Sequence, residues 1–375
     1  MFYVALKIML YNKVRSFITL LGIVFAISLI FAQIGIFIGS METSSTIIDH
    51  APGDIWVTSK NIRNFDFSQP IPEYLYYQVL STEGVQWAEN LIVTWGVIKQ
   101  KQGGTEQVEI VGYNPDTGVG GPWKMKAGCA EAVKNGNFAI VDESAMKRIG
   151  QTQVGDYREV LWRRLQIAGI SQGVKSVTTA PIIFTSYQYA QKLVGMLGPD
   201  STVFIIAKAL PGYSVDEVIQ NLKRRLKGVD IYSKWDFSRR TRMYWTIETG
   251  AGFAFFMSIL ISLSIGILIV GQTIYNSTIE HIREFGTLKA LGADNSDIYR
   301  IIFSQALINA ILGYLLSLGL TLASLKIYEA LDLVVAVKVW VNMLMFVLTL
   351  FMCLSSAFIS VRKVKKIDPA ILFRD

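Results

Sequence analysis

Long apolar stretches and polar stretches follow one another along this chain. Four stretches contain no Asp, Glu, Lys, Arg or His: residues 16–41, 249–279, 301–325 and 339–361. Because a hydrocarbon core about 30 Å thick needs roughly 20 helical residues, each stretch is long enough to cross a membrane. Helices of a soluble core rarely avoid charge over such lengths. The pattern therefore predicts four transmembrane helices at these positions.

Between the first and second stretches lies a long polar segment, residues 42–248, with shorter apolar runs. Residues 85–114 surround the turn sequence KQGGTEQ and predict a β-hairpin. Residues 138–150 predict a strand and a short helix, 154–171 a two-stranded return, and 180–226 an alternation of strands and helices. The predicted fold class is a membrane α-helical protein (four transmembrane helices) with an inserted extracytoplasmic α+β domain.

The remaining segments flank or connect the predicted spans. Residues 1–15 are too short to span and predict an interfacial N-terminal helix. The apolar core that follows is too long for a signal peptide, and no Ala-x-Ala site comes after it, so we expect an uncleaved anchor. The other three segments are a cytoplasmic coupling loop or helix, a short outer loop and a cytoplasmic tail: residues 280–300, 326–338 and 362–375.

Basic residues near the ends of the spans predict the orientation of the chain. Eleven Lys and Arg residues lie in segments 1–15, 280–300 and 362–375, whereas segment 326–338 has only its two terminal lysines. We therefore expect both termini and the 280–300 segment in the cytoplasm, and residues 42–248 outside. The expected location is the cytoplasmic (inner) membrane, as a multi-pass protein.

The stretch before the second span differs from this pattern. Arg239, Arg240 and Arg242 lie just outside the span, although long translocated domains are largely exempt from the charge rule. Four aromatic residues crowd the same stretch and predict the outer membrane interface: Trp235, Phe237, Tyr244 and Trp245.

Composition excludes several classes of function. The chain is 51% hydrophobic with a mean hydropathy of +0.38 and a net charge of +7, and most of that charge is explained by orientation rather than by nucleic-acid binding. Cys129 and Cys353 cannot plausibly meet, and His50 and His281 fall on opposite sides of the membrane. Neither a disulfide framework nor a metal site is expected. The outer segment has no G-x-S-x-G and no H-E-x-x-H, so catalysis there is not expected.

Polar and small residues within the spans indicate how the helices pack and argue against one class of transporter. No ionisable residue lies near a midplane, which argues against an ion-coupled carrier. The amides of Gln33, Gln272, Gln305 and Asn309 predict interhelical hydrogen bonds. Two G-x-x-x-G-type pairs allow close helix approach, and we expect a weak dimer contact at the first: Gly35 with Gly39, and Gly313 with Ser317.

The segment between the second and third spans carries the most informative pattern. Apolar residues recur at every third position and predict a short helix with an apolar stripe: Ile279, Ile282, Phe285, Leu288 and Leu291. Gly292 ends this helix, and Asp294 with Asp297 suits the start of the third span. Such a helix fits a cytoplasmic partner; the alternative is an ordinary turn on the lipid surface.

The same segment resembles a known signature. The run REFGTLKALGA, residues 283–293, is similar to R-E-x-G-x-x-[RK]-A-[LM]-G-A of the FtsX/MacB-type permeases of ABC transporters, with Phe285 where Ile or Leu is commoner. The tail VRKVKKIDPAILFRD resembles the basic Asp-Pro-Ala tail of that family, and the layout of spans matches the whole chain. Residues 39–60 look closest to the DevC-like branch, and 141–156 resemble the MacB outer-domain core.

The resemblance implies a permease subunit that forms a homodimer and is not itself an enzyme. It would bind a separate cytoplasmic ABC ATPase, which holds ATP and Mg, through these residues: Glu280, Arg283, Glu284, Phe285, Gly286, Leu288, Lys289, Ala290, Leu291, Gly292 and Ala293. No cofactor is expected in this chain, because it has no G-x-x-x-x-G-K-[ST] and the run GVGGPW lacks the Lys and the helix that hold phosphate.

The resemblance also implies a mechanism of mechanical transmission, in which ATP hydrolysis moves the outer domain. With a membrane-fusion protein and an outer-membrane channel, this movement would drive export of a lipid-like or other amphiphilic substrate. Two alternatives stay open. The first is an FtsX-like signal transmitter that activates an envelope hydrolase without transport, and the second is a membrane scaffold with no ATPase.

Overall fold

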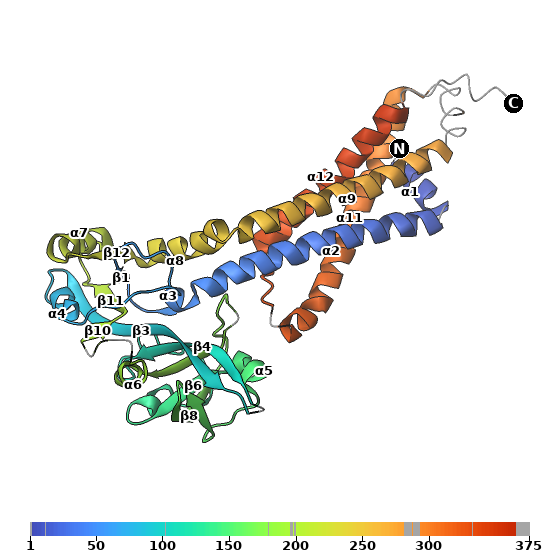
Figure 1. Ribbon diagram of the computed structural model, residues 1–375. Helices are drawn as coiled ribbons and strands as arrows, with labels where there is room; N and C mark the ends of the chain where they lie inside the picture. Colours follow the sequence, from blue (N-terminus) through green and yellow to red (C-terminus); the bar gives the residue numbers. More distant parts are fainter. Residues whose placement is uncertain are drawn as a thin grey trace. The chain divides into compact units, whose positions relative to one another are not determined.

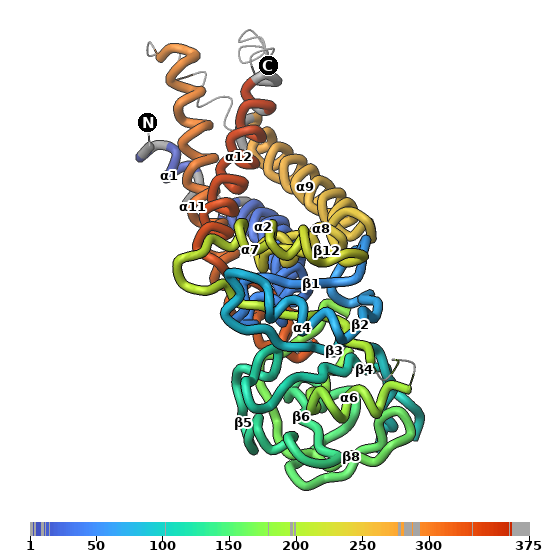
Figure 2. Tube along the Cα trace, turned by 90° about the vertical axis from the view of Figure 1, so that its left-hand side faces the viewer, coloured from blue at the N-terminus to red at the C-terminus, as the bar shows by residue number. Residues whose placement is uncertain are grey.

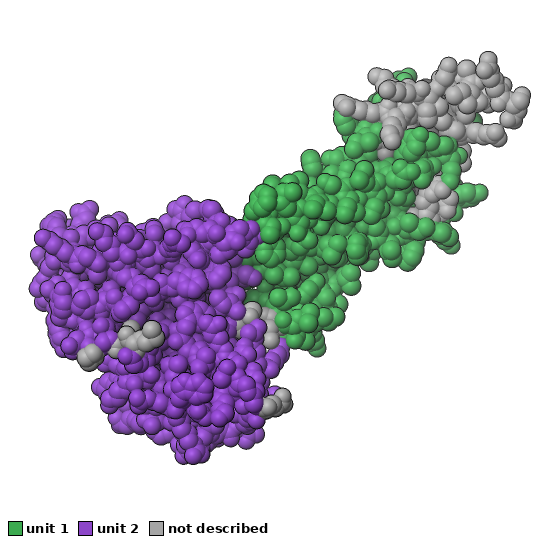
Figure 3. Space-filling model, in the orientation of Figure 1, with its two compact units in different colours: residues 1–39, 252–375 green, residues 40–251 purple. Residues whose placement is uncertain are grey.

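The computed structural model describes residues 2–11, 13–101, 103–178, 180–195, 198, 200–280, 287, 293–331 and 333–364. The chain divides into two compact units (Figure 3). The membrane unit consists of residues 1–39 and 252–375, and the outer unit consists of residues 40–251. The predicted outer segment, residues 42–248, lies within the second unit.

The membrane unit is helical throughout its described elements. The helices are α1 (Phe2–Tyr11), α2 (Lys13–Ser44), α9 (Ala251–Glu280), α11 (Asn295–Ala330) and α12 (Val339–Val364). Among the described residues, four helices are long and apolar enough to cross a membrane: Ser16–Ser44, Ala251–Asn276, Asn295–Ala330 and Val339–Ile359. Asp294 caps α11, and its backbone N–H donates to the carboxylate of Asp297 at 3.2 Å, as the sequence predicts.

Glycines set the spacing of the long helices, which run along one another in Figure 1. A Cβ added at Gly22 of α2 would lie 2.5 Å from Ile269 of α9, and one at Gly313 of α11 would lie 2.3 Å from Ile23 of α2. The Ser317 hydroxyl of α11 also donates to the carbonyl of Val24 at 3.3 Å. Gly313 and Ser317 therefore pack α11 against α2 of the same chain.

The outer unit is built on a ten-stranded sheet with the strand order β12-β1-β11-β3-β4-β9-β6-β8-β5, and β7 pairs with β3 and β8. A second, two-stranded sheet pairs β10 with β2. The strands are β1 (Ile55–Ser59), β2 (Ile71–Pro72), β3 (Val85–Lys99), β4 (Thr105–Tyr113), β5 (Met125–Gly128), β6 (Phe138–Asp142), β7 (Tyr157–Val160), β8 (Arg163–Ser171), β9 (Ile182–Ser186), β10 (Ser201–Thr202), β11 (Phe204–Ala209) and β12 (Val229–Ser233). The helices are α3 (Thr46–His50), α4 (Leu75–Leu80), α5 (Met146–Ile149), α6 (Tyr187–Leu193), α7 (Val215–Arg225) and α8 (Lys234–Met243), with a π turn, η3 (Tyr244–Glu248), after α8.

The long strand β3 joins the two ends of this sheet. Its first half pairs with β11 and its second half with β4. From β4 the ladder runs through β9, β6, β8 and β7 and returns to β3 at Ile98–Val160, so six strands close on themselves. Figure 2 shows the order from β12 and β1 at one end of the unit to β6 and β8 at the other. Strand β3 therefore belongs both to this closed set of strands and to the part of the sheet that contains β11.

The largest buried side chains of the outer unit form an aromatic core. Trp56, Phe65, Phe204 and Phe237 lie with ring centroids 5.2–6.5 Å apart. Phe237 is completely buried, whereas Trp235 is 66% exposed. The prediction that Phe237 lies at the membrane interface is therefore wrong, because α8 turns this ring toward β1 and β11.

Most other predictions for the outer segment are confirmed. The hairpin is β3–β4, the strand with a short helix is β6 with α5, and the two-stranded return is β7–β8. The sequence pattern missed β5, β12 and helix α8. The amide of Gln272 donates to Asn276 of the same helix at 3.3 Å, and the interhelical bond predicted for Gln272 stays a prediction.

Candidate functional site

Side-chain hydrogen bonds join two short helices of the outer unit, α3 and α8. Along the chain, α3 follows α2, and α8 precedes η3 and α9. Arg242 of α8 donates from Nη2 to Asp49 Oδ2 at 2.5 Å and from Nε to Ser45 Oγ at 2.8 Å. Ser45 in turn donates to Asp49 Oδ2 at 2.8 Å. Each of the three side chains therefore bonds both others, and we call this set the helix clamp.

Further bonds support the helix clamp. Lys234, the first residue of α8, donates its ammonium to the carbonyl of Ala51 at 2.7 Å, and its backbone N–H bonds to the carbonyl of Asp54 at 2.7 Å. Thr246 of η3 donates to the carbonyl of Arg242 at 2.8 Å. Because the Arg242 and Asp49 side chains are 40% and 33% exposed, the ion pair itself contributes no more than about 1 kcal/mol. The main effect of the helix clamp is therefore to fix the direction of α8 rather than to stabilise the fold.

A second tie connects η3 to the sheet. Trp245 donates its indole N–H to Asp66 Oδ2 at 3.0 Å, and Asn64 Nδ2 donates to the same oxygen at 3.0 Å. Trp95 of β3 donates to the backbone carbonyl of Asp66 at 2.9 Å. We call Asn64, Asp66, Trp95 and Trp245 the indole latch. It links the turn that precedes α9 directly to the strand that joins both ends of the sheet.

Two buried carboxyl groups, those of Asp66 and Glu109, lie close to each other at the indole latch. Burial raises the pKa of Asp66 to about 6, against the opposing effect of the Trp245 hydrogen bond. Burial also raises the pKa of Glu109 to about 8, the charge of Asp66 adds to the effect, and a Ser176 hydrogen bond opposes it. Glu109 Oε1 has no hydrogen-bond partner among the described residues. Glu109 is therefore held as a neutral acid at neutral pH.

Of the predicted ATPase-coupling residues, only Glu280 and Ala293 are among the residues that the structure describes. Glu280 is exposed at the end of α9, and Ala293 directly precedes the α11 cap. The others lie outside the described residues: Arg283, Glu284, Phe285, Gly286, Leu288, Lys289, Ala290, Leu291 and Gly292. Their role as the coupling contact stays a prediction.

Gly35 and Gly39 of α2 lie against the segment that connects α11 to α12. A Cβ at Gly39 would lie 2.0 Å from the carbonyl oxygen of Val334, and one at Gly35 would lie 2.5 Å from Val335. The backbone N–H of Ala336 also donates to the carbonyl of Gly35 at 2.9 Å. The close approach that the motif allows is thus made within the chain, while the contact with a second copy stays a prediction.

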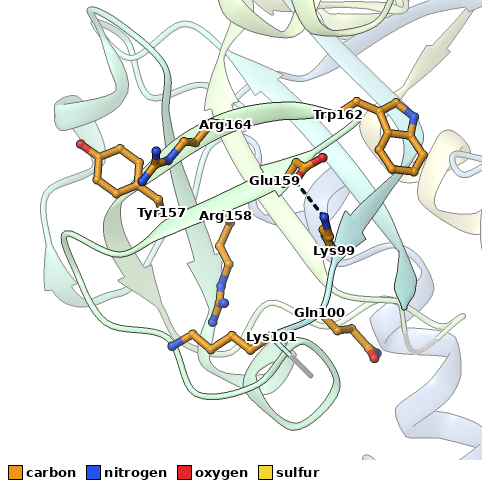
Figure 4. A pocket seen from close by; sticks show the side chains of 8 residues that line it. All are labelled: Lys99, Gln100, Lys101, Tyr157, Arg158, Glu159, Trp162 and Arg164. Atoms are coloured by element: carbon orange, nitrogen blue, oxygen red, sulfur yellow. Dashed lines mark hydrogen bonds and ion pairs between the residues drawn. The ribbon is translucent and has the colours of Figure 1, made fainter. Parts of the chain in front are cut away.

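A basic pocket of about 330 Å³ lies at the β7–β8 turn of the outer unit (Figure 4). Lys99 lies 3.5 Å from Glu159, and the Arg164 guanidinium lies 4.2 Å from the centre of the Tyr157 ring. Trp162 is 72% exposed and, like Leu161 before it, has a positive φ. Asn and Gly are the usual residues at such positive-φ positions, so Leu161 and Trp162 adopt a strained backbone here. The turn presents the indole of Trp162 to solvent.

The described residues offer no group of three or more His, Cys, Asp and Glu that could hold a metal ion. Cys129 is exposed and Cys353 is buried, and both are free thiols. The helix clamp and the indole latch were not predicted, because each joins residues from distant parts of the chain. The signal that pointed toward them was the group of arginines and aromatic residues before the second span.

Comparisons with protein families cover nearly the whole chain. The MacB-like periplasmic core domain matches residues 16–225, and the FtsX-like permease C-terminal domain matches residues 255–369. An uncharacterized ABC transporter permease of Mycobacterium tuberculosis strain H37Rv is 24% identical over 387 residues, covering 100% of this chain and 99% of that protein. The match therefore includes the spans and the outer unit together.

Two further similarities concern MacB proteins. The macrolide export ATP-binding/permease protein MacB of Psychrobacter arcticus is 25% identical over 353 residues, which cover 86% of this chain and 51% of that protein. The crystal structure of the periplasmic region of MacB from Actinobacillus actinomycetemcomitans gives a TM-score of 0.41 at 13% identity, covering 52% of this chain and 96% of that one.

Proposed function

This chain belongs to the FtsX/MacB-like family of ABC transporter permeases, and on that premise we propose that it transmits ATP-driven movement across the membrane to its outer unit. It is a membrane protein with an extracellular domain. The family is one of permease subunits, which are not themselves enzymes. In our proposal a separate cytoplasmic ATPase binds the 280–293 segment, and the movement drives export of a lipid-like or other amphiphilic substrate with a membrane-fusion protein.

The observation that supports this proposal most strongly is the pair of ties in the outer unit. The helix clamp joins α8 to α3, which follows α2 after a single residue, and the indole latch joins η3 to β3. Two candidate spans thus continue into segments that are bonded to each other and to the sheet. A helix that shifts under ATP binding would carry these bonded segments with it, which is the physical requirement for transmission.

The exposed Trp162 at the β7–β8 turn supports the extracytoplasmic half of the proposal. An exposed indole beside cationic side chains is a surface suited to a protein partner, since Trp and Arg are enriched at the centres of interfaces. In our proposal the fusion protein binds on the outer unit and receives the movement there.

Co-purification with the ATPase tests the proposed coupling contact. We expect the full chain to recover the ATPase and stimulate ATP hydrolysis, and a Glu284→Gln, Gly286→Leu variant to lose both while still inserting in the membrane. The matched control is Glu131→Gln, an exposed carboxylate of the outer unit, which should behave as the unaltered chain. Full recovery and stimulation in the double variant would show that the ATPase binds elsewhere.

A further inference from the structure

Three arginines lie close before α9, and the helix clamp uses only one of them. Arg242 bonds to Asp49, but Arg239 and Arg240 point elsewhere and, with Arg63, line an open pocket of about 470 Å³. Carboxylates and apolar or aromatic side chains complete the lining: Tyr232, Asp236, Met243, Tyr244, Ile247 and Glu248. The proposed function gives this pocket no role.

The cationic groups of the pocket are largely available to a ligand. Arg63 has no hydrogen-bond or ion-pair partner among the described residues, and Arg239 lies over the ring of Trp235 at 5.2 Å, which leaves its N–H groups unbonded. Arg240 donates from Nε to the carbonyl of Ile62 at 2.8 Å, and its guanidinium lies 5.5 Å from the centre of the Tyr232 ring. Guanidinium groups gathered in this way suit the oxygens of a phosphate.

The acidic side chains of the pocket do not cancel this charge. Asp236 accepts a hydrogen bond from the Ser233 hydroxyl at 2.6 Å as part of the α8 cap, which draws its carboxylate toward the start of the helix. Glu248 remains as the second carboxylate. Three arginines against two carboxylates leave the pocket with a net charge of +1.

An apolar stripe runs beside the arginines. Trp235, Arg239, Met243 and Ile247 follow one another at intervals of four residues and so share one face of α8 and η3. Trp235, Met243 and Ile247 are 66%, 44% and 63% exposed. A face that combines a basic residue with large exposed apolar side chains is typical of a helix at a lipid surface.

The position of the pocket along the chain limits its distance from the membrane. Only Thr249 and Gly250 separate Glu248 from Ala251, where the candidate span α9 begins. Three peptide links of 3.8 Å cover at most about 11 Å, so Glu248 lies no farther than this from the first residue of the candidate span. The end of the pocket at Glu248 is therefore the part nearest to the candidate span along the chain.

We propose that Arg63, Arg239 and Arg240 bind the phosphate of an anionic phospholipid of the outer leaflet, while Met243 and Ile247 contact its acyl chains. This inference goes beyond the proposed function, because it requires neither an ATPase nor a transported cargo. A bound lipid would limit the movement of α8 relative to the bilayer surface. Because the helix clamp joins α8 to α3, the clamp would be held there as well.

Lipid retention measured by native mass spectrometry tests the inference on the full chain in an uncharged detergent. The probes are phosphatidylglycerol and the matched diacylglycerol, which has the same acyl chains without phosphate. We expect the unaltered chain to bind phosphatidylglycerol at least about tenfold more tightly than diacylglycerol, and Arg63→Gln, Arg239→Gln to lose that preference. Neither arginine has a side-chain hydrogen bond to lose, so the double variant should fold normally.

Controls separate the pocket from general charge and from free phosphate. Arg224→Gln removes one exposed charge of α7 and should keep the preference. Excess inorganic phosphate should leave the lipid bound, because it cannot occupy the apolar stripe. The inference is overturned if the double variant retains phosphatidylglycerol like the unaltered chain, or if inorganic phosphate displaces the lipid completely, which would identify free phosphate as the ligand.

Discussion

In the membrane unit, helices approach one another at glycines, whereas the outer unit packs large aromatic rings and buries two carboxyl groups. The Cβ positions of Gly22, Gly39 and Gly313 are all filled by neighbouring residues of the same unit. In the outer unit, the ties that fix α8 and η3 are hydrogen bonds to Asp49 and Asp66. The first unit should therefore respond mainly to added volume, and the second to lost volume and to pH.

The largest expected effect comes from the aromatic core of the outer unit. Phe237→Ala should destabilise the protein by roughly 3–5 kcal/mol, because the ring is completely buried among Trp56, Phe65 and Phe204. Trp235→Ala, two residues earlier on the exposed face, is the matched control and should cost no more than about 1 kcal/mol, because it loses only the contact with the Arg239 guanidinium. Thermal unfolding of the full chain in detergent, followed by tryptophan fluorescence, measures the difference. Equal effects would mean that α8 does not turn Phe237 into the core.

Added volume tests the membrane unit. Gly39→Ala should cost about 1–3 kcal/mol, because the new Cβ would lie 2.0 Å from a backbone oxygen that cannot move aside as a side chain could. Gly319→Ala in α11 has nothing within 4 Å and should leave stability unchanged or slightly raised. The measurement is the thermal midpoint of each variant in the same detergent. A tolerated Gly39→Ala would contradict the contact between α2 and Val334.

Acidity should affect the outer unit through Glu109. Its raised pKa means that the folded state keeps a proton up to about pH 8, whereas the unfolded carboxyl loses it near pH 4.5. Between these values the folded state binds more protons, so the free energy of unfolding falls as pH rises, by up to about 1.4 kcal/mol per pH unit.

Glu109→Gln removes that titration and should flatten the dependence between pH 5 and 8, with the variant more stable than the unaltered chain at pH 8. Asp66, whose pKa is also raised, supplies the slope that remains below about pH 6. Thermal midpoints across this range measure the effect, with the exposed Glu131→Gln as a control that keeps the original slope. An unchanged slope in Glu109→Gln would show that this carboxyl is ionised in the folded protein.

The smallest expected effect belongs to the helix clamp. A double-mutant cycle with Arg242→Gln and Asp49→Asn should give a coupling free energy of about 0.2–1 kcal/mol, because both side chains are partly exposed. ATPase stimulation should fall by more than this small stability change explains, since the clamp fixes the direction of α8. A clamp variant with full stimulation and export would remove this pair from the transmission path.

The spans and most outer strands could be predicted because their signals are local. A charge-free run of more than 20 residues and a strand–turn–strand pattern need no knowledge of the rest of the chain. Phe237 and Trp235 could not be told apart, because both are aromatic residues of one short helix and only its packing on β1 and β11 decides which is buried. Helix α8 itself was missed although it begins with a local N-cap, Ser233, whose hydroxyl accepts from the Asp236 backbone N–H.

The helix clamp and the indole latch could not be predicted from the sequence. Asp66 and Trp245 are 179 residues apart, and Asp49 and Arg242 are 193 apart, so no periodicity relates them. Gly35 and Gly39 were identified as positions of close approach, but the motif says nothing about which segment approaches. The resemblance of residues 283–293 to the family signature was the strongest functional signal, and the family comparisons confirm the recognition that it led to.

Labelling with a membrane-impermeant maleimide on intact cells tests most directly that the 280–293 segment and the outer unit lie on opposite sides of the membrane. The exposed Cys129 reports on the outer unit, and Thr287→Cys in a Cys129→Ser background reports on the coupling segment, while Cys353 is buried. We predict that Cys129 reacts from outside and that the cysteine at position 287 reacts only after the membrane is permeabilised. Reaction of both thiols on intact cells would place the two regions on one side and contradict the account.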